Sequence, residues 1–330
     1  MQRGIQGRSG RMQERERWVR FLFVALLGLM TVGCNEKIED PIGNAAPPVN
    51  ATKPSQVSSE PPSAGKSRKV GVSLPEKSAF YLAMQNAMET TAQANSMTLD
   101  FQYADLQTDR QMQQVDAFIK SGVDAILFCP ADPKQSEAAV KRANTAQIPL
   151  FTVHLRAAHG DIEAHIGTDE GMGGQMAAQK IAALLKEKGN VLLEEVPNDP
   201  DKDQQERARG FQEEIARHPT LRLLHLWETG RRDLPINAIF FVNDEAASQT
   251  PASLTGGKSD PVVIVGYGGE ARARAEIKKG QSYKADISPD PLRLGVTALD
   301  TIARSLRGEK AEAFVKVPPE VLDASSVDKP

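Results

Sequence analysis

The sequence predicts an α/β protein of two similar Rossmann-like lobes, each built on a parallel β-sheet. Short apolar segments alternate with helical patterns along most of the chain, as expected of βαβ units. This alternation starts afresh after residues 165–168. The chain has 330 residues, of which 40% are hydrophobic and 25% charged, which is enough for two globular domains.

The first lobe is expected to contain four strands and three helices before the restart. The segment at 109–120 places Val115 and Phe118 on one face of a helix, and Gly122 follows its end. The continuously apolar segment at 124–129, which contains Cys129 as a small hydrophobic residue, indicates a buried parallel strand. The expected strands are 69–74, 98–103, 124–129 and 148–153, and the expected helices are 79–94, 109–120 and 135–146.

The second lobe repeats the pattern but looks trimmed. Only residues 228–235 separate two expected strands, whereas a parallel crossover with its helix needs about a dozen residues. The next connection, 244–260, contains Pro251 and several Ser and Thr residues, which make a poor helix. The expected strands are 190–196, 221–227, 236–242, 262–265 and 283–287, and the expected helices are 171–186, 203–217, 271–279 and 291–307.

The N-terminal segment is typical of an export signal. Arginines at 15, 17 and 20 precede a run of apolar or small residues at 21–33, which is shorter than the roughly 20 residues that span a bilayer. Thr31-Val32-Gly33-Cys34 resembles a bacterial lipobox, which implies cleavage before Cys34 and lipidation of its thiol. An uncleaved anchor or an ordinary signal peptide is the alternative, and translation could begin at Met1 or at Met12.

A proline-rich linker follows the predicted lipidated cysteine. Residues 35–67 contain six prolines and show no apolar periodicity, so they are expected to form an extended tether. The net charge of −3 provides no general attraction for nucleic acid or for an anionic membrane. The protein is therefore expected to be exported and anchored to a membrane by lipid, on the periplasmic or cell-surface side.

The stretch VIVGYGGEARA at 263–273 matches the G-x-G-x-x-A pattern of dinucleotide-binding turns. Asp286 follows Gly266 by 20 residues, which is where a ribose-binding acid would fall. The motif lies late in the chain, however, and little sheet remains beyond it for a second nucleotide half. We therefore favour a strand, a glycine turn and a helix without a nucleotide, and no cofactor is expected.

Several segments together resemble the periplasmic sugar-binding proteins of ABC importers, the ribose-binding type related to the LacI repressor core. The resemblance rests on KVGVSL, GVDAILFCPADPKQSEAAVKRANTAQIPLFTV, HIGTDEGMGGQMAAQKIA, ERARGF, IFFVNDEAA, VIVGYGG and LRGEK, in that order. It implies two lobes that close over a ligand and a hinge of three crossings, near residues 167–170, 287–290 and 315–319. No helix-turn-helix pattern precedes Lys69, which argues against a repressor.

The export signal, the linker and the resemblance together predict a division of the chain. The expected parts are a signal peptide at 1–33, the lipidated cysteine and linker at 34–67, a first lobe at 68–168 plus 290–317, a second lobe at 169–289, and a C-terminal tail at 318–330.

The resemblance implies ligand contacts at the cleft ends of both lobes. Phe80 and Tyr81 fall on the first cleft loop, Asn243 falls at the end of a strand, and Tyr267 falls on the glycine turn. Aromatic rings stack on sugars, and amides pair with hydroxyl groups. The alternatives are that the two aromatic residues pack their own helix and that Asn243 caps a turn or helix.

Other positions depart from the family's pattern. His154 stands where the family has an acid, and the arginine that follows this acid in the family is missing. Arg156 is a candidate substitute for that arginine, and Gln205 replaces a second arginine. Gly268 and Pro289 stand where the family has an acid and a glutamine, whereas Arg207 is retained and is interpreted as a structural or surface residue. Tight ribose binding should be lost, and restoring an acid by Gly268→Asp should raise the affinity for a hydroxyl-rich ligand if the cleft still works.

Two functions remain open from the sequence. The first is a solute-binding lipoprotein that captures a small polar ligand, which the resemblance implies is a carbohydrate, and presents it to an ABC permease. The second is a sensor or interaction lipoprotein with a membrane partner such as a kinase. An enzyme is not expected because nucleophile-elbow and zinc-protease motifs are missing, and the spacing of His154, His159 and His165 does not indicate a metal site.

Overall fold

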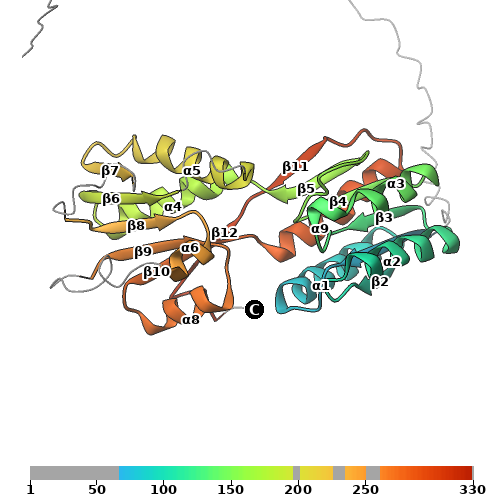
Figure 1. Ribbon diagram of the computed structural model, residues 1–330, viewed down its shortest axis with the longest axis horizontal. Helices are drawn as coiled ribbons and strands as arrows, with labels where there is room; N and C mark the ends of the chain where they lie inside the picture. Colours follow the sequence, from blue (N-terminus) through green and yellow to red (C-terminus); the bar gives the residue numbers. More distant parts are fainter. Residues whose placement is uncertain (1–66, 196–200, 226–234, 250–260, 329–330) are drawn as a thin grey trace, which may run out of the picture. The chain divides into compact units, whose positions relative to one another are not determined.

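Two six-stranded sheets with helices on both faces make up the described part of the protein (Figure 1). The computed structural model describes residues 67–195, 201–225, 235–249 and 261–328. The predicted α/β fold of two parallel-sheet lobes is therefore confirmed. The predicted signal segment, Cys34 and nearly all of the linker lie outside the described residues.

The first sheet is entirely parallel, with strand order β11-β5-β4-β3-β1-β2. Its central strands β3 and β4 are fully buried, as expected for strands covered by helices on both faces. The strands are β1 (Arg68–Leu74), β2 (Met97–Tyr103), β3 (Ala125–Phe128), β4 (Leu150–Val153), β5 (Ala164–Thr168) and β11 (Phe314–Val317).

Two pairs of helices cover the first sheet. α1 (Ala79–Ala94) and α9 (Pro291–Leu306) share one hydrophobic cluster, and α2 (Thr108–Ser121) and α3 (Glu137–Thr145) share another. A short 3-10 turn, Pro133–Gln135, precedes α3. The apolar faces predicted from helical spacing thus become the two layers of the first core.

The second sheet has the order β12-β10-β9-β8-β6-β7, with β12 antiparallel to β10 and the other neighbours parallel. One hydrophobic cluster joins the sheet to α4 and α5, and another includes apolar residues of α6 and α8. The elements are α4 (Glu170–Leu184), β6 (Gly189–Glu194), α5 (Lys202–Ile215), β7 (Leu221–His225), β8 (Ala238–Phe241), α6 (Asp244–Gln249), β9 (Val263–Tyr267), α8 (Ala271–Lys279), β10 (Tyr283–Ser288) and β12 (Glu320–Asp323).

Three segments connect the two sheets at the expected positions. The chain passes from β5 to α4 at Asp169, from β10 to α9 at residues 289–290, and from β11 to β12 at residues 318–319. Residues 320–323, expected in a C-terminal tail, instead form β12, because their backbone groups pair with the edge of β10. Most of the expected short connection at 228–235 lies outside the described residues.

Helices α4 and α5 approach each other closely because glycines line their contact. A Cβ atom on Gly174 would lie 2.0 Å from the carbonyl oxygen of Arg207, and one on Gly210 would lie 2.0 Å from the carbonyl oxygen of Gly171. Only a residue without a side chain fits at such a backbone contact. This close contact fixes where α5 places the side chain of Arg207 relative to α4.

Candidate functional site

The first lobe carries an aromatic cluster formed by Phe80, Tyr81 and His154. Phe80 and Tyr81 lie in the first turn of α1, and His154 directly follows β4. The ring centroids of Phe80 and His154 are 4.8 Å apart, and those of Phe80 and Tyr81 are 5.2 Å apart at right angles. The sequence predicted all three as ligand contacts, and the structure brings them together at the carboxyl end of the first sheet.

Tyr81 forms the inner side of this aromatic cluster. Its side chain is buried, and its hydroxyl lies 3.6 Å from the sulfur of Cys129, which is fully buried at the end of β3. Burial raises the pKa of the Cys129 thiol to about 11, so the sulfur is neutral. Phe80 is only partly buried, which leaves it as the more accessible aromatic face of the pair.

His154 is held in an unusual backbone conformation. Its φ is +63°, a region that residues with a side chain rarely occupy, and its backbone N–H donates to the carbonyl of Ile166 at 2.9 Å. Burial lowers the pKa of His154 to about 4. Its imidazole is therefore neutral at neutral pH and offers one hydrogen-bond donor and one acceptor, where the family's pattern has a carboxylate.

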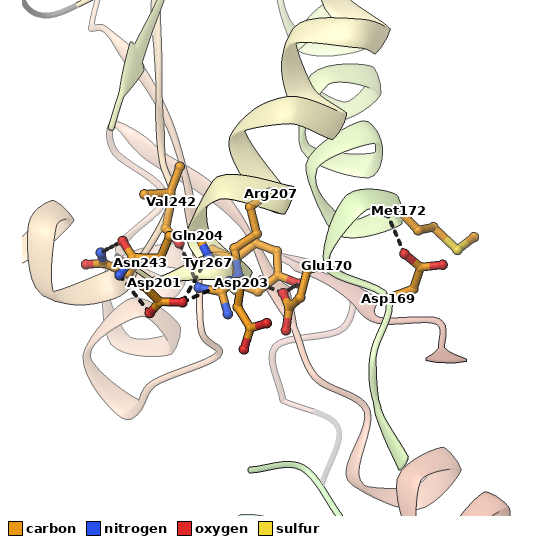
Figure 2. Close-up of polar contacts among 10 residues, drawn as sticks. All are labelled: Asp169, Glu170, Met172, Asp201, Asp203, Gln204, Arg207, Val242, Asn243 and Tyr267. Atoms are coloured by element: carbon orange, nitrogen blue, oxygen red, sulfur yellow. Dashed lines mark hydrogen bonds and ion pairs between the residues drawn. The ribbon is translucent and has the colours of Figure 1, made fainter. Parts of the chain in front are cut away.

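The second lobe contains a charged network of Glu170, Arg207 and Tyr267 (Figure 2). Arg207 Nε donates to Glu170 Oε2 at 2.7 Å, and its Nη1 donates to the carbonyl of Val242 at 3.0 Å. The guanidinium carbon lies 4.0 Å from the centre of the Tyr267 ring, and the Tyr267 hydroxyl donates to Glu170 Oε2 at 2.5 Å. Arg207 is thus a structural partner of three elements, as the sequence suggested.

The charge of Arg207 is compensated inside this network. Burial by itself would lower the pKa of Arg207, but the adjacent Glu170 carboxylate outweighs burial and raises that pKa. Burial and the same carboxylate raise the pKa of the Tyr267 hydroxyl well above its usual value. The arginine is therefore permanently charged, the tyrosine is neutral, and the buried pair of opposite charges is satisfied without a ligand.

Asn243 lies beside this network, after the end of β8. Its Oδ1 accepts from the backbone N–H of Ala246 at 2.7 Å, and its Nδ2 donates to Gln204 Oε1 at 2.6 Å. Gln204 in turn donates to Asp201 Oδ2 at 3.1 Å, and Asp201 caps the start of α5 (Figure 2). Asn243 therefore performs the capping role that was its alternative interpretation.

The remaining predicted contacts occupy different environments. Arg156 and Gln205 are exposed, whereas Tyr267 is buried within the charged network. Sequence reasoning missed Glu170 and Gln204. The position of Glu170 could have indicated its role. Glu170 is the first residue of α4, directly after the capping residue Asp169, and it lies at the first crossing between the two sheets.

The glycine turn at residues 266–270 encloses the chain's own carboxyl groups. A Cβ on Gly266 would lie 1.7 Å from the Tyr283 hydroxyl, and Asp286 is fully buried and accepts from the Gly269 N–H at 2.9 Å. The acid at the ribose-binding spacing therefore lies inside the protein, bonded to the turn itself. This supports the interpretation of the motif as a structural turn rather than a dinucleotide site.

The affinity gain expected for Gly268→Asp must be corrected. Gly268 has φ of +147°, which is essentially restricted to glycine, and a Cβ there would lie 2.7 Å from Asp244 Oδ2. An added carboxylate would also meet a second carboxyl group. We expect Gly268→Asp to lower the free energy of unfolding by about 3 kcal/mol and not to raise the affinity for a sugar.

Urea unfolding with and without sugars would measure this effect. Gly280→Asp is the matched control, because Gly280 also has a positive φ (+68°) but no neighbouring atom within 4 Å of its Cβ position, so about 1 kcal/mol is expected. Equal stability of the two variants, or tighter sugar binding by Gly268→Asp than by the wild type, would show that the turn relaxes to accept a side chain.

Comparison with known proteins supports this architecture. Residues 70–310 match the family described as periplasmic binding protein domain. The chain is 27% identical over 254 residues to the ribose import binding protein of Bacillus subtilis, covering 72% of this chain and 81% of the relative. It is 26% identical over 273 residues to a putative rhizopine-binding protein of Rhizobium meliloti, covering 75% and 87%.

Solved structures share the fold at lower identity. A solute-binding protein of an ABC transporter from Bacillus halodurans, solved with myo-inositol, has a TM-score of 0.56, 23% identity and coverage of 80% of this chain and 98% of its own. The XylFII–LytSN complex has a TM-score of 0.69, 20% identity and coverage of 79% and 99%. Among the described residues, no helix is both long and apolar enough to cross a membrane, and no group of three or more His, Cys, Asp or Glu is placed to hold a metal.

Proposed function

This chain belongs to the periplasmic binding protein domain family, and we propose that it captures a small hydroxyl-rich molecule, a carbohydrate or polyol, for an ABC importer. Relatives named for ribose, xylitol and apiose support this ligand class. The observation that carries the proposal is the aromatic cluster, in which a partly buried Phe80 lies against a neutral His154 at the end of the first sheet.

The chemistry of the candidate contacts favours a neutral ligand. A phenyl ring packs on the apolar face of a sugar ring, and the neutral imidazole can both donate to and accept from hydroxyl groups. Arg207 has its charge compensated by Glu170, so it does not supply an unpaired cation for an acidic ligand. Binding would shift an equilibrium toward a closed conformation in which both lobes contact the ligand.

A thermal-shift screen of sugars, polyols and nucleosides on the full chain tests this proposal. A ligand at 100 times its Kd should stabilise the protein by about 2.7 kcal/mol. Phe80→Ala should weaken that ligand's binding at least tenfold, because the stacking face is removed.

Leu82→Ala serves as the matched control in the same helix, since Leu82 is 39% exposed and lies outside the aromatic cluster. If no compound stabilises the protein, or if both variants weaken binding equally, the aromatic cluster is not a ligand site.

We further propose that the protein is a lipoprotein anchored through Cys34. The support is the apolar run at 21–33 and the small Gly33 before the cysteine. Several acyl chains would hold the protein on a membrane, because each buried methylene contributes about 0.8 kcal/mol. In a bacterial host, Cys34→Ser should move the protein from the membrane fraction to the aqueous fraction, whereas Cys129→Ser should not. Retention of Cys34→Ser in the membrane fraction would argue for an uncleaved anchor.

A sensor role is the second candidate. It is favoured by the altered polar positions His154 and Gly268, and by the likeness of fold to a chain of the XylFII–LytSN complex, which was solved as two proteins bound to each other. Affinity capture from membranes with the lipid-anchored protein distinguishes the two roles. Recovery of a permease with its ATPase supports import, and recovery of a sensor kinase supports signalling.

A further inference from the structure

Two buried carboxyl groups of the second lobe meet at one tyrosine hydroxyl. The Tyr283 hydroxyl oxygen lies 2.9 Å from Asp244 Oδ1 and 2.8 Å from Asp286 Oδ2. Asp286 is 0% exposed and Asp244 is 7% exposed. A tyrosine hydroxyl has one hydrogen and can donate to only one of these oxygens. The other contact is a hydrogen bond only if a carboxyl group carries a proton and donates it to the tyrosine.

The glycine turn at 266–270 depends on the same two carboxyl groups. The N–H of Gly269 donates to Asp286 Oδ1 at 2.9 Å, and the N–H of Glu270 donates to Asp244 Oδ2 at 2.9 Å. These N–H groups precede α8, so the turn binds carboxyl oxygens of its own chain where a nucleotide-binding turn would bind phosphate. The position of the turn is therefore linked to the protonation of the pair.

No cationic side chain is among the main influences on the pKa of Asp286. The ionisable groups on the neighbouring elements are Glu245 of α6, Glu270 before α8, Arg272 and Arg274 of α8, Lys284 of β10 and Glu320 of β12. The Lys284 Nζ donates to the carbonyl of Gly280 at 2.7 Å. The Arg274 Nε donates to the carbonyl of Gly269. Lys180 of α4 pairs with Asp323 of β12. Asp323 lies opposite Ala285 of β10, and Ala285 faces the other side of the sheet from Asp286. Burial, followed by the adjacent Asp244, raises the pKa of Asp286 well above its ordinary value.

We propose that Asp244 and Asp286 share one proton at neutral pH through Tyr283, and that this proton fastens the glycine turn to the second sheet as a pH-sensitive latch. The pair then carries a single negative charge and satisfies both N–H donors of the turn. Release of the proton would place two like charges in a buried space and push the turn outward. The latch concerns the internal packing of the second lobe and holds whichever ligand the protein binds.

The sign of the pH dependence follows from linkage. The pKa of Asp286 is higher in the folded protein than in the unfolded chain, so the folded state holds an extra proton between those two pKa values. The stabilising contribution is complete at acidic pH and is lost as the pH rises through the folded pKa. For one proton, the unfolding equilibrium constant rises by up to about tenfold per pH unit across this window.

Asp286→Asn tests the latch, because an amide of the same shape can donate to Tyr283 or Asp244 and accept from Gly269 at every pH. We expect the unfolding constant of the wild type, divided by that of Asp286→Asn, to rise by up to about tenfold per pH unit. Both constants are measured in urea from about pH 5 to pH 8. Asp300→Asn is the control, since Asp300 is exposed and an asparagine there can still accept from Asn95. Its ratio to the wild type should stay constant.

A second measurement does not depend on the folding of a variant. Carbon-13 NMR of carboxyl-labelled aspartate in the wild-type full chain should show one protonated carboxyl group at neutral pH, distinct from the exposed aspartates. A ratio for Asp286→Asn that stays constant with pH, or a spectrum in which all aspartates ionise in the ordinary acidic range, would overturn the proposal.

Discussion

Gly174→Ala is expected to destabilise the protein by about 3 kcal/mol, even though alanine is normally the better helix former. The added methyl carbon would lie 2.0 Å from the carbonyl oxygen of Arg207 and 2.7 Å from the backbone nitrogen of Phe211. Both are main-chain atoms, so no side-chain rotation can make room and α5 must move away from α4. The free energy of unfolding in urea, followed by circular dichroism, measures the loss.

Met172→Ala is the control for the same helix, because Met172 is 40% exposed and its truncation should change stability by at most about 0.5 kcal/mol. If Gly174→Ala is no less stable than this control, α4 and α5 can separate at little cost. In that case the close backbone contact would not be what positions Arg207.

Glu170→Ala is expected to cost about 3–5 kcal/mol, because it leaves the buried guanidinium of Arg207 without its carboxylate. The two side chains of this ion pair are only 13% and 16% exposed, and Tyr267 loses its hydrogen-bond acceptor at the same time. A second arginine–glutamate ion pair, with both residues on α5, provides a matched comparison. Arg209 binds Glu206 at 2.6 Å, but those side chains are 51% and 47% exposed.

Glu206→Ala should therefore cost no more than about 1 kcal/mol. Urea unfolding of both variants at the same salt concentration compares the two ion pairs directly. Equal losses from the two substitutions would mean that solvent reaches the Glu170–Arg207 pair as freely as the surface pair.

Much of the fold could be predicted because helix and strand periods are local properties of the sequence. The helices at 79–94 and 271–279 have the predicted bounds, and the other predicted helices differ by at most two residues at either end. Strands β5, β11 and β12 were not predicted as strands. Each has only four or five residues, and β11 and β12 lie at sheet edges where polar residues interrupt the apolar pattern.

The candidate site was harder to predict because it depends on the directions in which side chains point, and these directions cannot be read from the sequence. Gln205 was predicted as a polar contact, but Gln204 is the residue that bonds Asn243. Neighbouring residues on a helix point about 100° apart, so a shift of one position selects a different face. Gly268 was treated as a missing acid because the sequence does not reveal its φ or the carboxyl group of Asp244 beside it.

The late position of α9, β11 and β12 in the chain affects the order of folding during synthesis. β11 pairs with β5 across about 150 residues of sequence, and α9 packs against α1, where Asn95 and Asp300 are 205 residues apart. Neither sheet can be completed before the last segment of the chain has been made. Contacts between distant residues slow folding. If the protein is exported, as we propose, its chain would therefore stay unfolded for longer after synthesis and remain able to pass through a translocation channel.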